Sequence, residues 1–291
     1  MKKSNKILQG VLILFFIILC AAIILPFLLL VSVSLSSPEA VAQGYKLIPN
    51  PVDLSAYQYV LKDPTAILKA YGVTFVFSVA AMVLGVLLMS MIAYPLARTK
   101  LKGKNAINFY IYFTMLFGGG LVPTYLLVAK TLHLNDTIWV YIILGLINPW
   151  NMFMIRTFFK GIPGEIIESA TIDGASEYTI FLKMILPLSK PVLATVALLT
   201  FLGKWNDWYT ALIYIENPDL YSLQYLLQKL LTDLDLLKQL REMGGNLDQP
   251  DVPGETVRMA MAVIAAGPAL VVFPFFQKYF VKGLTVGSVK G

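Results

Sequence analysis

Six blocks of apolar residues divide the chain, and each is about as long as a lipid bilayer is thick. They run over residues 11–33, 70–97, 107–129, 137–158, 191–214 and 257–281. A transmembrane helix needs roughly 20 mostly apolar residues, because a helix satisfies its own backbone hydrogen bonds in lipid. The blocks therefore predict an all-α, polytopic membrane protein in which residues 1–291 form a single transmembrane domain of six helices.

Charge and cysteine content agree with a membrane class. Only 14% of the residues are charged, whereas an ordinary soluble domain carries about 25%. The formal net charge of +6 is attributed to membrane topology rather than to nucleic acid, which is not expected as a partner. The one cysteine, Cys20, lies inside the first apolar block, so neither an intrachain disulfide nor a cysteine metal cluster is expected.

The first apolar block has two interpretations. Lysines precede it, and Ala40-Val41-Ala42 after it resembles a signal-peptide cleavage site. The apolar core of a signal peptide runs for only about 7–15 residues, however, and residues 11–33 exceed that length. We therefore expect a retained transmembrane helix here.

Basic residues predict the orientation of the helices. Lysines and arginines precede the first block, follow the second block, and recur in the tail at residues 282–291. The loop 215–256 instead carries eight acidic residues against three basic ones. Because cytoplasmic loops are enriched in Lys and Arg, both termini and the segment between the fourth and fifth helices should be cytoplasmic.

That cytoplasmic segment, residues 163–187, reads as two short helices joined at Gly174. Glycine permits the left-handed backbone that ends one helix and turns into the next. The second helix carries one apolar stripe, formed by Ile180, Phe181, Met184 and Ile185. Such a segment either docks into a groove of a partner protein or lies on lipid headgroups. The longer stretch from Arg156 to Lys190 carries four basic and four acidic residues. This balance favours docking, since interfacial helices are usually strongly basic.

Several stretches resemble a known family. The run Glu168-Ser169-Ala170-Thr171-Ile172-Asp173-Gly174-Ala175, followed by Phe181 and Leu186-Pro187, resembles the EAA motif of the membrane subunits of ABC importers. The tail GLTVGSVKG, residues 283–291, resembles the smaller permease subunit of maltose-type sugar importers. Residues 255–291 look most like permeases for complex and acidic oligosaccharides.

The resemblance implies a type I ABC importer permease fold in a bacterial cytoplasmic membrane. In that family the motif forms cytoplasmic coupling helices that dock on the ATPase, which implies this role for Glu168, Ala170, Asp173, Gly174, Ala175, Phe181 and Pro187. The tail would reach the interface between ATPase subunits through Gly283, Gly287, Lys290 and Gly291, or would be a frayed terminus. The implied partners are a second homologous permease, two ATP-binding cassette subunits, an extracytoplasmic solute-binding protein and an oligosaccharide substrate.

The sequence excludes catalysis by the motifs that we searched. It has no G-x-x-x-x-G-K-[ST] phosphate loop, so ATP and Mg²⁺ are expected on a partner subunit and no cofactor is expected on this chain. His133 is the one histidine, which rules out an H-E-x-x-H zinc site, and no G-x-S-x-G nucleophile motif occurs. We therefore predict a non-catalytic membrane subunit, without catalytic or metal-binding residues.

The fifth block carries the most unusual polar residues. Lys204 and Asp207 lie three residues apart on one helical face, and a charge at the bilayer centre costs on the order of 2.5–3.5 kcal/mol. The stretch Lys204-Trp205-Asn206-Asp207-Trp208 resembles one common in sugar permeases. A substrate pathway is therefore predicted along the residues Trp205, Asn206, Asp207, Trp208, Tyr209, Asn151 and Arg258.

Other interpretations of these residues stay open. Lys204 and Asp207 would form a buried ion pair beside an interfacial aromatic belt, and Arg258 would reach the membrane surface as a simple anchor. A different function would also use the pair, because an ion-coupled secondary transporter needs ionisable groups deep in the membrane.

The long outer loop contains one further predicted helix. Leucines recur at helical spacing over about residues 219–243, which indicates an extracytoplasmic amphipathic helix. It would pack on its own protein, contact the external binding protein, or do both.

Overall fold

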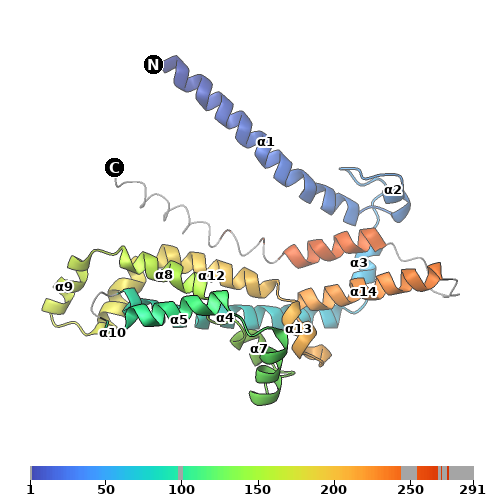
Figure 1. The fold of residues 1–291 in the computed structure, drawn as a ribbon. Helices are drawn as coiled ribbons and strands as arrows, with labels where there is room; N and C mark the ends of the chain where they lie inside the picture. Colours follow the sequence, from blue (N-terminus) through green and yellow to red (C-terminus); the bar gives the residue numbers. More distant parts are fainter. Residues whose placement is uncertain (1, 98–100, 244–253, 268–269, 271–273, 275–291) are drawn as a thin grey trace. The chain divides into compact units, whose positions relative to one another are not determined.

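The computed structural model describes residues 2–97, 101–243, 254–267, 270 and 274. These residues are mainly helical, and apart from one isolated bridge between Ser36 and Val52 no strand pairing occurs among them (Figure 1). The predicted all-α class is therefore confirmed. The described residues fall into two compact units, one from residues up to 67 together with 227–267, and one from residues 68–226.

The first unit begins with a long apolar helix, α1 (Lys2–Ser34). Its side chains are exposed from Leu8 to Leu28, as expected of a helix whose neighbours are lipid tails or another protein. Its last turn is buried, and the hydroxyls of Ser34 and Tyr57 lie 2.8 Å apart, which joins α1 to α3 (Ser55–Val60). A short helix, α2 (Pro38–Ala42), intervenes and contains the stretch that resembles a cleavage site.

Helix α4 (Pro64–Ala97) is the longest described element. It ends where the sequence predicted, but it begins at Pro64 rather than at residue 70. The reason is a cap: the carboxylate of Asp63 accepts a hydrogen bond from the backbone N–H of Ala66 over 3.0 Å, and proline is favoured in the first helical turn.

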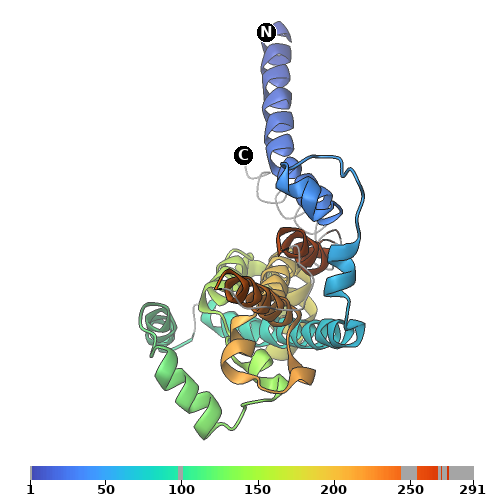
Figure 2. The ribbon, with the colours of Figure 1, turned by 90° about the vertical axis from the view of Figure 1, so that its right-hand side faces the viewer.

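The third predicted helix, residues 107–129, was wrong as a continuous element. It consists of α5 (Lys104–Leu116), α6 (Leu121–Tyr125) and a π-helix, η1 (Leu126–Thr131). The axes of the two halves differ in direction by 113°. The bend between them is visible in the green part of the ribbon in Figure 2. Three consecutive glycines, 118–120, separate them, and Gly120 has a positive φ of 83° that a side chain would disfavour.

Two further predicted helices are also divided. The block 137–158 forms α7 (Ile138–Ile143) and α8 (Pro149–Lys160), because Gly145 adopts a positive φ of 72° and Pro149 cannot donate the hydrogen bond that a continuing helix needs. The block 191–214 forms α12 (Lys190–Trp205) and α13 (Tyr209–Tyr214), with a short non-helical break between them.

The remaining helices follow the prediction more closely. Residues 163–187 contain α9 (Gly164–Ile172), α10 (Glu177–Ile180), the π-helix η2 (Phe181–Ile185) and the start of α11 (Leu186–Leu188). Residues 215–243 contain the 3-10 turn η3 (Pro218–Leu220) and α14 (Leu223–Glu242), as predicted for 219–243. The last predicted helix, 257–281, is described as helical over 254–267, and most of its remainder lies outside the described residues.

Two described helices, Leu8–Ser34 and Pro64–Ala97, are long and apolar enough to cross a bilayer. Two bent pairs raise the count to four if each pair is one span: Lys104–Leu116 with Leu121–Thr131, and Glu177–Leu188 with Lys190–Trp205. The six predicted spans and the single domain over residues 1–291 therefore stay predictions.

The second unit has two apolar cores. One lies where α4, α8, α10, η2 and α12 meet, and its fully buried members include Met89, Ala93, Met152, Ile155, Ile180, Ile185 and Val196. The other surrounds α7, where Tyr141 stacks on Phe77 of α4 with ring centroids 4.3 Å apart. Figure 1 shows α9 and α10 at one end of this unit, away from α7.

Candidate functional site

Residues 163–187 fold as the predicted pair of short helices joined by a tight turn. Gly174 has a positive φ of 79° directly after α9. The N–H of Gly174 donates to the carbonyl of Thr171 over 3.1 Å, and the N–H of Ala175 donates to the carbonyl of Ala170 over 2.9 Å. These two bonds form a Schellman motif, which satisfies carbonyls at the end of the helix and favours glycine at this position.

The second helix starts with its own cap and ends in the core. The hydroxyl of Ser176 accepts the N–H of Thr179 over 3.3 Å. Ile180, Phe181 and Ile185 are buried, which confirms the apolar stripe apart from the half-buried Met184. We call residues 163–187, from α9 through η2 to the start of α11, the knob.

The predicted ATPase-coupling residues divide between surface and core. Ala170 and Phe181 are buried and hold the knob on the rest of the unit. The exposed members are Glu168, Asp173, Gly174 and Pro187, and Ala175 is half-buried. Sequence reasoning missed Ile172, whose exposed fraction is 85% although the residue is strongly apolar.

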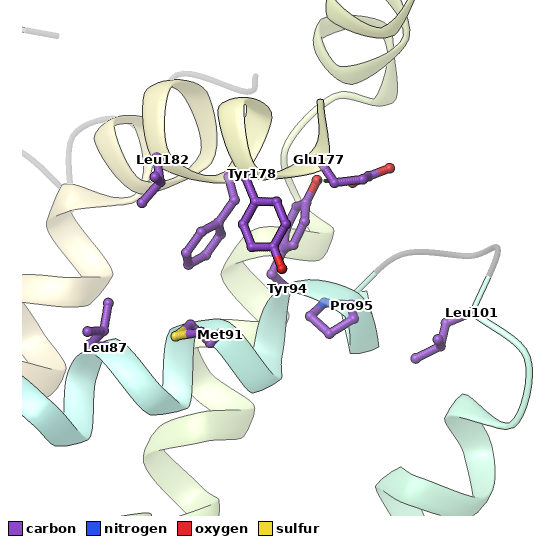
Figure 3. Close-up of a pocket in the computed structure, with 9 residues that line it drawn as sticks. Leu87, Met91, Tyr94, Pro95, Leu101, Glu177, Tyr178 and Leu182 are labelled. Atoms are coloured by element: carbon purple, nitrogen blue, oxygen red, sulfur yellow. Dashed lines mark hydrogen bonds between the residues drawn. The ribbon is translucent and has the colours of Figure 1, made fainter. Parts of the chain in front are cut away.

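A hydrogen bond joins the knob to the long helix α4. The hydroxyl of Tyr94, in the last turn of α4, donates to the carboxylate of Glu177 over 2.8 Å. The ring of Tyr94 also lies near the ring of Phe181, with centroids 5.3 Å apart. Figure 3 shows Tyr94 and Glu177 converging from α4 and α10. Both line an apolar groove of about 710 Å³.

The half-buried cation of the fifth predicted helix, Lys204, has partners other than the predicted one. The ammonium of Lys204 donates to the backbone carbonyls of Tyr141 and Leu144, each over 2.6 Å. These carbonyls lie at the C-terminal end of α7, where intrahelical donors run out and a cation is favoured. Lys204 therefore fastens the end of α7 to the last turn of α12.

The carboxylate of Asp207 also has a local partner. It accepts hydrogen bonds from the backbone N–H of Thr210 over 2.9 Å and from the Thr210 hydroxyl over 2.7 Å. This arrangement caps the start of α13. Because Lys204 and Asp207 are each engaged in holding a broken helix, the structure gives no support to the use of the two as ion-coupling groups.

The predicted pathway residues do not form one surface. Trp205 is 1% exposed and packs between Tyr71 and Phe201, with ring centroids 6.2 and 5.8 Å away. Asn151 is also buried, and the side chain of Asn148 accepts its backbone N–H as the cap of α8. Trp205 and Asn151 are therefore buried within this chain, and their assignment to a substrate pathway stays a prediction.

Three other residues of the predicted pathway are exposed beside the break between α12 and α13: Asn206, Trp208 and Tyr209. The rings of Trp208 and Tyr209 meet edge to face, with centroids 5.9 Å apart. Asn206 accepts a hydrogen bond from the side chain of Gln224 over 3.3 Å.

Arg258 belongs to the first unit, and its guanidinium pairs with Asp235 of α14. Nearby, the hydroxyl of Tyr45 donates to Glu255 over 3.1 Å, and this bond to a carboxylate raises the pKa of the tyrosine. Arg258 thus anchors α14 to the helical segment 254–267 in addition to any role in a pathway. The predicted tail contacts, Gly283, Gly287, Lys290 and Gly291, lie outside the described residues.

Comparison with known proteins identifies the family. Residues 2–286 match the family described as "Binding-protein-dependent transport system inner membrane component". The chain is 42% identical to Protein LplC of Bacillus subtilis over 93% of this chain and 90% of that protein. It is 36% identical to the polygalacturonan/rhamnogalacturonan transport system permease protein YtcP of the same organism, covering 96% of this chain and 95% of YtcP.

A solved structure gives the same result for the fold. A chain of a bacterial ABC transporter involved in the import of the acidic polysaccharide alginate matches with a TM-score of 0.79 and 30% identity, covering 95% of this chain and 98% of that one. The resemblance to ABC importer permeases predicted from the motifs is confirmed. Relatives named as transport system permeases likewise confirm the prediction of a non-catalytic membrane subunit. The chain therefore belongs to the family of binding-protein-dependent transport system inner membrane components.

Proposed function

We propose that the chain is the permease subunit of an ATP-driven importer of oligosaccharides, acidic ones among them, and couples to its ATPase through the knob. The observation that carries the proposal is the exposed α9–Gly174–α10 turn, which is anchored in the core by Ala170 and Phe181. Relatives named for polygalacturonan and arabinooligosaccharide transport, together with the alginate importer, support the substrate class.

The surface of the knob suits a protein groove. Ile172 is exposed at the C-terminal end of α9, and acidic side chains flank it at Glu168 and Asp173. A large exposed apolar side chain rimmed by polar groups is typical of an interaction site. Because the chain carries no phosphate loop, ATP and Mg²⁺ would bind to two partner subunits, each receiving a knob from one permease of a homologous pair.

The orientation follows from the same assignment. Knob, N-terminus and C-terminal tail would lie in the cytoplasm of a bacterium, in agreement with the lysines and arginines of these segments. The residues Gly283, Gly287, Lys290 and Gly291 would then reach the ATPase subunits. On the outer side, α14 would meet an extracytoplasmic solute-binding protein.

The exposed residues Asn206, Trp208 and Tyr209 are the best candidates for sugar contact. Aromatic rings pack against the apolar face of a sugar ring, and the amide of Asn206 can hydrogen-bond hydroxyl groups. All three lie at the break between α12 and α13, and broken helices in transporters commonly line a binding cavity.

Co-purification tests the coupling proposal. The tagged chain is extracted from its native membrane in mild detergent, and the proteins that accompany it are identified by mass spectrometry. We expect two ATP-binding subunits and a second permease with the wild-type chain, and loss of the ATPase with Ile172→Glu. Met243→Glu is the matched control, because Met243 is 84% exposed but lies at the end of α14. Recovery of the ATPase in full with Ile172→Glu would contradict the proposed docking surface.

Uptake tests the substrate class separately. A strain deleted for this chain is supplied with radiolabelled oligogalacturonate or with radiolabelled maltotriose, a neutral oligosaccharide. We expect the acidic sugar to enter the complemented strain and not the deletion strain. Equal uptake of oligogalacturonate by both strains would remove this substrate from the proposal and leave the coupling assignment untouched.

A further inference from the structure

The contact between the knob and α4 has a polar part and an apolar part. The polar part is the 2.8 Å hydrogen bond from the Tyr94 hydroxyl to Glu177, at the first turn of α10. The apolar part consists of buried side chains, chiefly Phe181 and Ile185 of η2, which pack in the core with Ala93 of α4. Tyr94 lies outside the stretch that resembles the EAA motif, and Glu177 lies within it but is not one of the residues that carry the resemblance.

Tyr94 lines two hollows. One is the groove of about 710 Å³, which is also lined by Glu177 and by Leu87, Met91 and Leu182 among others. The other is a cavity of about 580 Å³, lined mainly by residues of α9 and the end of α8. Free space therefore adjoins the bond that joins α10 to the last turn of α4.

The backbone of α4 is weakened at the same place. Pro95 follows Tyr94 inside the helix, and a proline removes the hydrogen bond to the carbonyl four residues earlier, here that of Met91. Helices bend readily at such a point. A movement of α10 that displaces Tyr94 therefore acts at a point where α4 bends at a low cost in free energy.

We propose that Tyr94 and Glu177 are positioning residues that transmit movement of the knob to α4 in the transport cycle. The inference rests on the proposed docking of the knob on an ATPase. Apolar side chains in contact can slide past one another, whereas a hydrogen bond to a carboxylate holds two atoms at a defined distance and direction. The Tyr94–Glu177 bond thus makes the last turn of α4 follow α10.

Hydrogen exchange tests this without any transported sugar. The complete complex, purified from native membranes into lipid nanodiscs, is measured by hydrogen-exchange mass spectrometry with and without ATP and vanadate. In the wild type we expect nucleotide to change exchange both in α9–α10 and in the second half of α4. In Tyr94→Phe, which keeps the ring, the change in α9–α10 should persist while the change in α4 falls about fivefold. A fivefold effect on an equilibrium corresponds to about 1 kcal/mol, the size expected for one exposed hydrogen bond.

Two further variants separate transmission from general stability. Glu177→Gln keeps an uncharged acceptor and should reduce the α4 change less than Tyr94→Phe does. The double variant should be no worse than Tyr94→Phe alone, as expected for partners in one interaction. Tyr110→Phe removes a hydroxyl from a 68% exposed tyrosine of α5 and should resemble the wild type. A structural role alone would lower the melting temperature in both nucleotide states and leave the nucleotide-dependent change in α4 intact.

The outcomes also separate this inference from the proposed function. Absence of any nucleotide response in α9–α10 of the wild-type complex would refute docking of the knob, and the inference with it. A normal knob response together with an undiminished α4 response in Tyr94→Phe would refute the inference alone.

Discussion

Replacing Lys204 by methionine should destabilise the chain, because it removes the cation that holds the end of α7. The methionine side chain fills similar space but donates no hydrogen bond, so the carbonyls of Tyr141 and Leu144 lose their 2.6 Å contacts. A hydrogen bond to a charged group contributes roughly 1.5–3 kcal/mol. Relief from burying the ammonium offsets part of two such bonds, which leaves a net loss of about 2–4 kcal/mol.

Thermal unfolding in detergent measures this loss. For a chain of this size a change of 1 kcal/mol shifts the melting temperature by about 2 °C, so Lys204→Met should melt roughly 4–8 °C lower than the wild type. Lys130→Met is the matched control, because Lys130 also lies in the last turn of a helix but is exposed. Equal melting temperatures for Lys204→Met and the wild type would refute the assignment of Lys204 as the fastening of α7.

The other predictions concern the packing of α4 at Gly85, the cap of α13 and the ion pair that holds α14. Gly85→Ala would place a methyl group 2.9 Å from the carbonyl oxygen of Leu146. We expect α4 and the break after α7 to move apart, at a cost of about 1–3 kcal/mol in the free energy of unfolding, which a lower melting temperature would show. Asp207→Ala should cost about 1 kcal/mol by uncapping α13, whereas Asp207→Asn, which also caps, should melt nearly as the wild type does. Arg258→Ala should lower stability by less than about 1 kcal/mol, since its pair with Asp235 is exposed, and the difference should shrink in high salt.

Hydropathy predicted the long uninterrupted helices well. The first block matches α1, and the C-terminal end of α4 at Ala97 was placed correctly. The knob was also predictable, because Gly174 and the stripe through Ile180 act locally, through backbone conformation and helical period.

Hydropathy could not predict the breaks, since apolar residues continue through them. The glycines at 118–120 and Gly145 with Pro149 were visible signals, but their effect depends on neighbours that stabilise the freed carbonyls. Lys204 is the clearest case: its partners, Tyr141 and Leu144, lie about 60 residues earlier in the chain. The burial of Trp205 was unpredictable for a similar reason, because the aromatic side chains that pack on it, Tyr71 and Phe201, were not identifiable from sequence spacing.

Site-specific cross-linking tests the central claim most directly. In a chain whose native Cys20 is replaced by serine, a single cysteine is placed at Ile172 or, as the control, at Met243, and native membranes are treated with a bifunctional maleimide. The account predicts a cross-link from position 172 to an ATP-binding subunit, weakened or strengthened by ATP with vanadate, and none to that subunit from position 243. Cross-links from position 172 to no ATP-binding subunit in either state would contradict it.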